Sequence, residues 1–241
     1  MWQKTNGIVF NSIKHKEKSY IVKIYTRNVG LQSFYVNIGA SAKKNGGVAH
    51  IQPLTLVEIE FSEKENLTLQ RAKEIKISEP YKSIPFDVNK SAIIIFLQEV
   101  LCKSIIENTA NENLFDFIWH SLLYYDLSEK NNNFHLAFLA KLLKYIGFLP
   151  KKIFIESDEY FDIKSGDYVP LKPFHSYYLE PAESLQLNFL FSNDYEEIST
   201  HKFSSIQRKL ILQALIDFYI FHLQGFKEIK SLKILQEVFA S

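Results

Sequence analysis

The spacing of the apolar residues changes once along this chain, close to Glu79-Pro80, and this change limits the folds that the chain can adopt. Before it, in the segments 32–38 and 57–61, apolar side chains occupy every second position. This period is typical of strands that bury one face. After it, apolar residues recur at helical spacing. The sequence therefore predicts an α+β protein, with a β domain followed by a mainly helical domain.

Five strands are predicted in the first 80 residues, separated by turns rich in lysine or glycine: Gly7–Ile13, Ser19–Thr26, 32–38, 57–61 and Leu67–Ile77. Five short strands suit a small barrel, and the OB-fold has this number. The longest connection, 39–47, is basic and rich in glycine. An OB-fold carries its nucleic-acid face on such strands and loops. We therefore predict a five-stranded OB-fold nucleic-acid-binding domain over residues 1–80.

The segment 80–87 contains two prolines and indicates a domain boundary, so a helical domain is predicted over residues 81–241. Its helices are expected over the segments 91–106, 109–127, 134–146, 181–191, 204–225 and 229–240. A capping box at 109–112 is expected to open the second helix. Gly147 and Pro150 should end the third, which carries one apolar stripe. Residues 151–180 are rich in aromatics and prolines, and they predict irregular or hairpin structure.

Positive charge is concentrated at the N-terminal end, although the net charge of the whole chain is only +1. Residues 1–50 hold eight basic residues and one acid, Glu17, so this segment carries +7 and the remainder −6. Such asymmetry points to nucleic acid or an acidic surface as the partner. A solvated lysine-rich face is the alternative, and composition alone does not decide between them.

Motifs for bond chemistry are missing from the sequence. There is no phosphate-binding G-x-x-x-x-G-K, no dinucleotide-binding G-x-G-x-x-G and no zinc-binding H-E-x-x-H. The seven histidines include no pair spaced by three or four residues, and the single cysteine, Cys102, cannot build a zinc site or an internal disulfide. We therefore predict that the protein is not an enzyme and has no catalytic residue, bound metal or cofactor.

Hydropathy argues against a membrane. The longest apolar block, 92–97, is much shorter than the roughly 18 residues that span a bilayer. The N-terminal residues lack the apolar core of a signal peptide. We expect a cytoplasmic protein without a membrane partner.

Aromatic and basic side chains are interleaved on the second and third predicted strands and their turns. Bases stack on exposed aromatic rings, at about 1–3 kcal/mol per base, while lysines follow the phosphates. Because neighbours on a strand point to opposite faces, we expect Phe34 in the core and Tyr35 outside. The competing interpretation is that most of these aromatics form the barrel core. The candidate DNA-binding residues are Lys14, Lys16, Lys18, Lys23, Arg27, Tyr35, Lys43 and Lys44.

An ordered set of short motifs resembles the RecO family of recombination and repair proteins. In the first domain the motifs are Gly7-Ile8-Val9, Tyr25-Thr26 followed by Gly30-Leu31, Gly39-Ala40, Gln52-Pro53-Leu54 and Leu67-Thr68-Leu69. In the second they are Phe134 with Leu139, Leu142, Gly147 and Pro150, and then Tyr219, His222 and Lys230-Ser231-Leu232. The resemblance covers nearly the whole chain.

This resemblance implies a non-enzymatic mediator of DNA repair. Members of the family bind single- and double-stranded DNA and anneal complementary strands. They engage the RecR protein and the C-terminal tail of the single-strand binding protein, and they assist loading of the RecA recombinase. The resemblance thus implies association with the nucleoid at sites of repair.

The chain departs from the family pattern in the helical domain. Many relatives carry four cysteines as a zinc finger after the position of Gly147, whereas this chain has none there. We expect a small zinc-free hairpin lobe around Phe161 to Tyr168. In it, either an aromatic cluster replaces the metal as a small core, or the lobe is loosely packed; the cluster consists of Phe154, Tyr160, Phe161, Tyr168 and Phe174.

A second departure concerns the tail of the single-strand binding protein. Many relatives place basic residues just before the central helix, where this chain has asparagines at 131–133. The candidate tail-binding residues are therefore Lys130, Lys141 and Lys144, with Leu142, Leu143 and Ile146 as apolar surface beside them. A solvated lysine face is the alternative.

Two other functions stay open at this point. The first is an OB-fold protein that binds single-stranded DNA or RNA without recombination partners. The second is a scaffold whose OB domain binds only protein.

Overall fold

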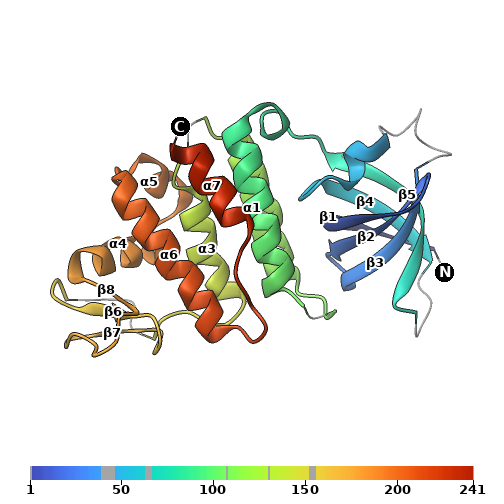
Figure 1. The fold of residues 1–241 in the computed structure, drawn as a ribbon. Coiled ribbons are helices and arrows are strands. Elements are labelled where there is room, and N and C mark those ends of the chain that lie inside the picture. The colour runs from blue at the N-terminus through green and yellow to red at the C-terminus, as the bar shows by residue number, and fades with distance from the viewer. Residues whose placement is uncertain are drawn as a thin grey trace. The chain divides into compact units, whose positions relative to one another are not determined.

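The computed structural model describes residues 2–38, 47–62, 67–106, 108–129, 131–151 and 156–240 of the chain. Contacts divide the chain into two compact units (Figure 1). The first comprises 1–127 and 229–241, and the second comprises 128–228. The boundary expected at residue 80 coincides with the end of the last barrel strand, at Glu79. The next two helices belong to the same compact unit as the barrel.

The first unit contains the expected five-stranded OB-fold barrel. Its strands are β1 (Trp2–Lys16), β2 (Ser19–Thr26), β3 (Gly30–Asn37), β4 (Leu56–Ser62) and β5 (Leu69–Glu79). They close in the order β1-β2-β3-β5-β4, with β3 and β5 parallel and the other pairs antiparallel. β1 is longer than expected, because it continues past Ile13 to Lys16. The first two candidate lysines, Lys14 and Lys16, therefore lie on a strand.

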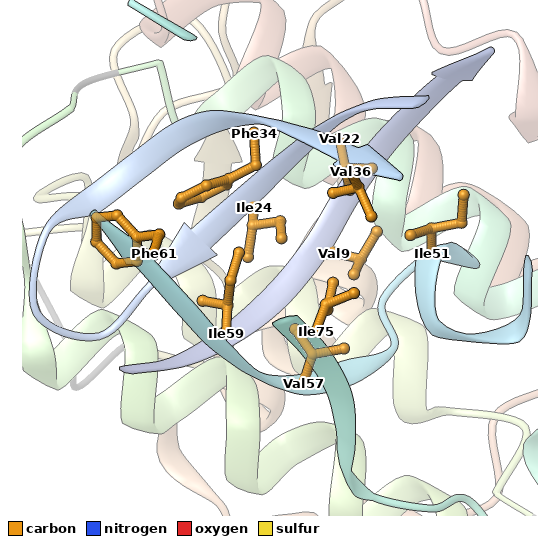
Figure 2. Packing of buried hydrophobic residues seen from close by; sticks show 10 residues of the cluster. All are labelled: Val9, Val22, Ile24, Phe34, Val36, Ile51, Val57, Ile59, Phe61 and Ile75. Carbon is orange, nitrogen blue, oxygen red and sulfur yellow. The ribbon is translucent and has the colours of Figure 1, made fainter. Parts of the chain in front are cut away.

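Alternating side chains from all five strands fill the barrel (Figure 2). Phe34 and Phe61 meet edge to face there, with ring centroids 5.1 Å apart. Phe34 is fully buried and Tyr35 is half-buried on the outside, which confirms the predicted alternation. The short helix η1 (Gly47–Ile51) adds Ile51 to this core.

Three α-helices complete the first unit: α1 (Val88–Ser104), α2 (Glu112–Leu127) and α7 (Ser231–Ala240). The N-terminus of α2 differs from the expected capping box. Asn111, not Thr109, caps the helix, and its side-chain oxygen accepts from the Leu114 amide at 3.0 Å. The preceding residues, Asn108 and Thr109, lie close to Gly30 of the barrel. A Cβ atom on Gly30 would collide with them. These residues are not helical, and the helix starts three residues later than expected.

The turn between the barrel and α1 contains η2 (Ile84–Phe86) and is fastened by one carboxylate of α2. Asp126 accepts hydrogen bonds from the backbone amides of Lys82, Ser83 and Ile84, at 2.7, 2.9 and 3.0 Å. The buried Lys90 ammonium donates to the carbonyl oxygens of Tyr125 and Asp126. This segment is thus an ordered part of the first unit and not a loose linker.

The second unit is built from α3 (Phe134–Tyr145), α4 (Pro181–Ser192), α5 (Tyr195–Thr200) and α6 (Ser205–His222). α3 ends as expected at Gly147, which has φ +85°, and the Phe148 amide donates back to the Leu143 carbonyl at 2.9 Å. The predicted single apolar stripe of α3 is wrong, because nearly all of its side chains are buried. The six-residue α5 was not expected, because it is too short to show a period. No helix in the described ranges is long and apolar enough to cross a membrane.

The segment 156–179 forms the expected hairpin lobe. β6 (Tyr160–Asp162) pairs with β7 (Asp167–Val169) and with β8 (Tyr178–Leu179). Phe161 packs on Tyr168, with centroids 4.9 Å apart, and on Phe218 of α6. Phe174, expected in this small core, is fully exposed instead, because it lies in the loop before β8 and not on a strand. Phe154 lies outside the described residues.

Candidate nucleic-acid interface

Part of the outer surface of the barrel is closed by α1 and α2. Tyr25 packs between Phe10 and Phe115 of α2, at centroid distances of 5.5 and 6.0 Å. Its hydroxyl donates to the Asn111 carbonyl, and burial raises its pKa to about 12. Gln98 of α1 donates to the Phe10 carbonyl. This part of the surface is therefore core between barrel and helices, and it is closed to a ligand.

The outer surface nearer the β1–β2 turn is open. There the strand register places one residue from each of four strands in a line: Ile13, Ile21, Tyr35 and Arg71. We call these four residues the open row. Ile13 is 60% exposed, Ile21 and Tyr35 are half-buried, and Arg71 is exposed. His15 meets the Tyr35 ring edge to face, with centroids 6.1 Å apart.

Three lysines lie beside the open row at the β1–β2 turn: Lys14, Lys16 and Lys18. All are exposed, and within the described residues none of them forms an ion pair. Lys14 is opposite Tyr20, whose side chain packs on the barrel core, so Lys14 faces away from Ile13. The lysines therefore surround the end of the β1–β2 ribbon and do not form a single flat patch.

The side of the barrel made by the start of β1 with β4 and β5 is different, because its charges are paired. Lys4 lies 3.4 Å from Glu58, Lys73 lies 2.6 Å from Glu60, and Lys76 lies 2.8 Å from Glu74. A hydrogen bond from Lys76 lowers the pKa of Glu74. Cations already paired with carboxylates offer little to a phosphate backbone. Among the described barrel residues, lysines without an ion pair are therefore found at the β1–β2 turn, beside the open row, and not on this side.

Two of the candidate residues, Arg27 and Lys23, lie further from the β1–β2 turn than the open row. Arg27 forms two parallel hydrogen bonds of 3.0 Å with Asp116 and an ion pair of 3.0 Å with Glu112, so its guanidinium is committed to α2. The bond from Arg27 lowers the pKa of the Asp116 carboxyl. Lys23 is half-buried in the adjoining row, opposite Asn11 and Ser33. Lys43 and Lys44 lie outside the described residues.

Sequence reasoning missed Ile13 and Arg71 as members of the surface. Arg71 lies beside Tyr35 only because β5 pairs with β3 in parallel, which is a long-range consequence of barrel closure. The signal was available in the OB-fold strand order, but not in the local pattern around residue 71. Ile13 was predicted as a strand residue. Its side chain is exposed because the end of β1 extends beyond the residues that close the barrel.

The candidate tail-binding residues of α3 are placed unequally. Lys144 is exposed, whereas Lys141 is half-buried, donates to the Asn193 carbonyl and lies over the Tyr195 ring. Burial lowers the pKa of Lys141, with Asp194 acting in the opposite direction. Leu142 and Leu143 are fully buried, so the expectation that they supply surface beside the lysines is wrong. Lys130 lies outside the described residues.

The asparagines before α3 are structural. Asn131 and Asn133 are both buried, at 5% and 4% exposure. The Asn133 amide donates to the carbonyls of Ile198 and His201, at 2.9 Å each. Asn133 therefore ties the start of α3 to the end of α5, Asn131 accepts from the Asn133 backbone amide at 3.2 Å, and neither buried side chain is open to a peptide. Among the described residues, no group of three or more histidine, cysteine or acidic side chains could hold a metal ion.

Comparison with known protein families covers almost the whole chain. The family model described as "Recombination protein O N terminal" matches residues 1–81, and "Recombination protein O C terminal" matches residues 85–233. The first match spans the OB-fold barrel, and the second spans the helices α1 to α6 and the hairpin lobe and ends at the start of α7.

Individual relatives align with this chain over nearly their full length. The DNA repair protein RecO of Flavobacterium psychrophilum is 40% identical over 98% of this chain and 99% of its own. The protein of the same name from Phocaeicola vulgatus is 34% identical over all of both chains. That of Bacteroides fragilis is 36% identical over 99% of this chain and all of its own. The chain therefore belongs to the RecO family of DNA repair proteins.

Proposed function

We propose that this protein is a mediator of homologous recombination that binds single- and double-stranded DNA and anneals complementary strands. It acts with RecR to load the RecA recombinase, and it works by binding without making or breaking covalent bonds. Membership of a family named for DNA repair supports the repair role. The observation that carries the DNA-binding step is the set of unpaired lysines beside the open row.

The electrostatics of the barrel support a phosphate backbone as the ligand. Each phosphate contact with a lysine releases condensed counterions, and this term is independent of sequence. An annealing protein needs this independence, because it must hold any two complementary strands. The stacking surface of the open row adjoins these cations, as in other OB-folds that bind single strands.

An annealing assay tests this proposal directly. Two complementary labelled oligonucleotides are mixed with the wild-type protein or with the variant in which Lys14, Lys16 and Lys18 are all changed to alanine. We expect the variant to lose most of the acceleration of annealing while its melting temperature stays that of the wild type. Lys73→Ala on the ion-paired side is the matched control and should anneal normally. Equal annealing by the wild type and the triple variant would contradict the proposal.

The single-strand binding protein's acidic tail is the proposed partner of the second unit, through Lys144. This lysine is exposed and forms no ion pair with the described residues, whereas the Lys141 ammonium is already held by Asn193. A carboxylate hydrogen bond from a partly desolvated lysine contributes about 1.5–3 kcal/mol. Lys144→Ala should therefore weaken binding of a labelled acidic tail peptide about ten-fold and leave DNA affinity unchanged. Equal loss of both would place the tail site elsewhere.

A further inference from the structure

The connection between β7 and β8 presents apolar side chains to solvent. We call residues 170–177 the lobe loop, which runs from one edge of the three-stranded sheet to the other, because β6 lies between β7 and β8. Phe174 is fully exposed, and Leu171 is 80% exposed. At the end of the loop, Tyr177 meets Phe221 of α6 edge to face, and both rings are exposed. Apolar side chains gathered in one exposed part of a folded domain are characteristic of a binding site.

Polar contacts fasten the lobe loop on both sides of its exposed ring. Lys172 pairs with Glu180 at 2.7 Å, and Nε2 of His175 lies 3.3 Å from the Asp162 carboxylate. Two of the eight loop residues are prolines, which restrict the backbone further. Phe174 therefore extends from an ordered loop, and such a loop loses little conformational freedom when its side chain binds.

The hairpin lobe around this loop is acidic. Residues 156–183 contain two lysines and seven acids, so the segment carries −5. Glu156, Asp158 and Glu183 form no ion pair with the described residues. This charge repels a polyanion such as DNA, and it favours a partner surface on which apolar side chains are surrounded by cations.

The barrel of this same protein carries a surface of that kind. In the open row Ile13 is 60% exposed, and Ile21 and Tyr35 continue the apolar surface on the next two strands. The three lysines at the β1–β2 turn lie beside this row and form no ion pair with the described residues. An apolar centre with a charged rim is typical of protein interfaces, in which aromatic side chains are enriched.

We infer that the lobe loop of one copy of this protein docks on the open row of a second copy. Phe174 and Leu171 meet the apolar side chains of the row, and the acids of the lobe face the lysines of the β1–β2 turn. The contact joins two different surfaces and is therefore heterologous. Because the open row adjoins the proposed DNA site, DNA and the second copy compete for it, and this consequence rests on the proposed function.

Sedimentation of the full-length protein over a wide range of concentrations tests the inference. The average mass of the wild type should rise with concentration and fall on addition of salt. Phe174→Ala and Ile13→Asp should each weaken self-association about ten-fold or more, because each removes an apolar anchor of the contact. Phe86→Ala is the matched control: it removes a phenylalanine of η2 that is 84% exposed and should change nothing. All three side chains are exposed, so the melting temperatures should stay those of the wild type.

Mixing the two defective variants tests the heterologous contact itself. Phe174→Ala keeps an intact open row, and Ile13→Asp keeps an intact lobe loop. An equimolar mixture should therefore associate again, through one loop and one row in each pair. A wild type that stays monomeric at every concentration would overturn the inference. Self-association that survives Phe174→Ala, or a mixture that stays monomeric while the wild type associates, would overturn it as well.

A single-stranded oligonucleotide separates this inference from the proposed function. Saturating oligonucleotide should dissociate the self-associated wild type. If the oligonucleotide binds and self-association persists, the second copy does not occupy the open row and the inference fails. Self-association that follows the predicted pattern of variants in a protein that binds no oligonucleotide would support the inference and refute the proposed DNA binding.

Discussion

Single residues of this barrel take different roles according to which acids lie within reach. Arg27 and Lys16 are both basic residues of the N-terminal 50, and the sequence assigned both to DNA. Arg27 lies beside two acids of α2 and pairs with them, whereas Lys16, although it is next to Glu17 in the sequence, forms no ion pair with the described residues. The local pattern around a lysine or arginine does not contain this information. Charge counting therefore indicated the partner correctly in kind, but it overestimated the number of available cations.

Arg27 provides the clearest prediction at this scale. Arg27→Ala removes the two bonds to Asp116 and leaves two exposed carboxylates of α2 without a partner. We expect a lower melting temperature, because the contact between barrel and α2 is weakened, and a DNA affinity that changes less than about two-fold. Thermal unfolding and a DNA titration of the same preparation measure both. A large loss of DNA affinity at unchanged stability would show that Arg27 binds the backbone itself.

At the scale of secondary-structure elements, the C-terminal helix is held by one carboxylate. α7 lies beside α1 (Figure 1), and Glu99 of α1 accepts from the backbone amides of Lys230 and Ser231, at 3.0 and 2.8 Å. The Ser231 hydroxyl also donates to it at 2.6 Å. Glu99 thus satisfies amides at the start of α7, where a negative charge is favoured by the helix dipole.

This contact makes stability depend on pH. Burial opposes ionisation of Glu99, but hydrogen bonds from Lys103, Ser231 and Lys230 outweigh it and lower the pKa of this carboxyl to about 2. Because the pKa is depressed in the folded state, the contribution is complete above the unfolded value of about 4.3 and is lost as the pH falls toward 2. Glu99→Gln should cost about 1–3 kcal/mol at pH 7 and less at pH 3, because part of the stabilisation from the lowered pKa of Glu99 is already lost there. Urea unfolding at both pH values measures this, and an equal cost at the two would refute the assignment.

The hairpin lobe is held by an aromatic contact with α6 in the described structure. Phe161 of β6 stacks on Phe218 of α6, with centroids 6.0 Å apart, and His222, which itself stacks on Phe218, places its Nε2 2.8 Å from the Ile163 carbonyl oxygen. Gly166 allows this approach, because its φ is +74° and a Cβ there would lie 3.1 Å from the rings of Phe218 and His222. These contacts occupy the part of the chain where the family resemblance implies a zinc finger in many relatives.

We expect two results for this lobe. His222→Ala should lower the free energy of unfolding by about 1–2 kcal/mol, through loss of a hydrogen bond and a stacked ring. Incubation with a chelator should leave the melting temperature of the wild type unchanged, because this segment contains no cysteine that could form a zinc finger. One equivalent of tightly held zinc per chain in elemental analysis would contradict this account.

For the molecule as a whole, the sequence predicted the architecture well and the surfaces poorly. The change of period near residue 80 and the alternation in β3 and β4 depend on neighbours in sequence, and the structure contains both of them. The predicted α3 stripe failed because helices of the second unit cover that helix on several sides, which no single-helix pattern reveals. Likewise, Ile13 and Arg71 are 58 positions apart in the sequence, and they lie in one row only because the barrel closes.

Charge is also organised at this scale. The chain has a net charge of only +1, yet the barrel pairs its cations on the side of β4 and leaves them unpaired at the β1–β2 turn. A nearly neutral protein can in this way present a localised site for a polyanion, with the field concentrated at one end of the barrel.

The salt dependence of binding to single-stranded DNA tests the central claim most directly, which is that unpaired lysines of the OB-fold barrel bind the phosphate backbone. If about 4–6 phosphates are neutralised, the logarithm of the affinity should fall with the logarithm of the salt concentration at a slope of about −3 to −4. Changing Lys14, Lys16 and Lys18 to alanine together should reduce the magnitude of this slope by about 2 and leave the melting temperature unchanged. A triple variant that keeps both the slope and the affinity of the wild type would contradict the account.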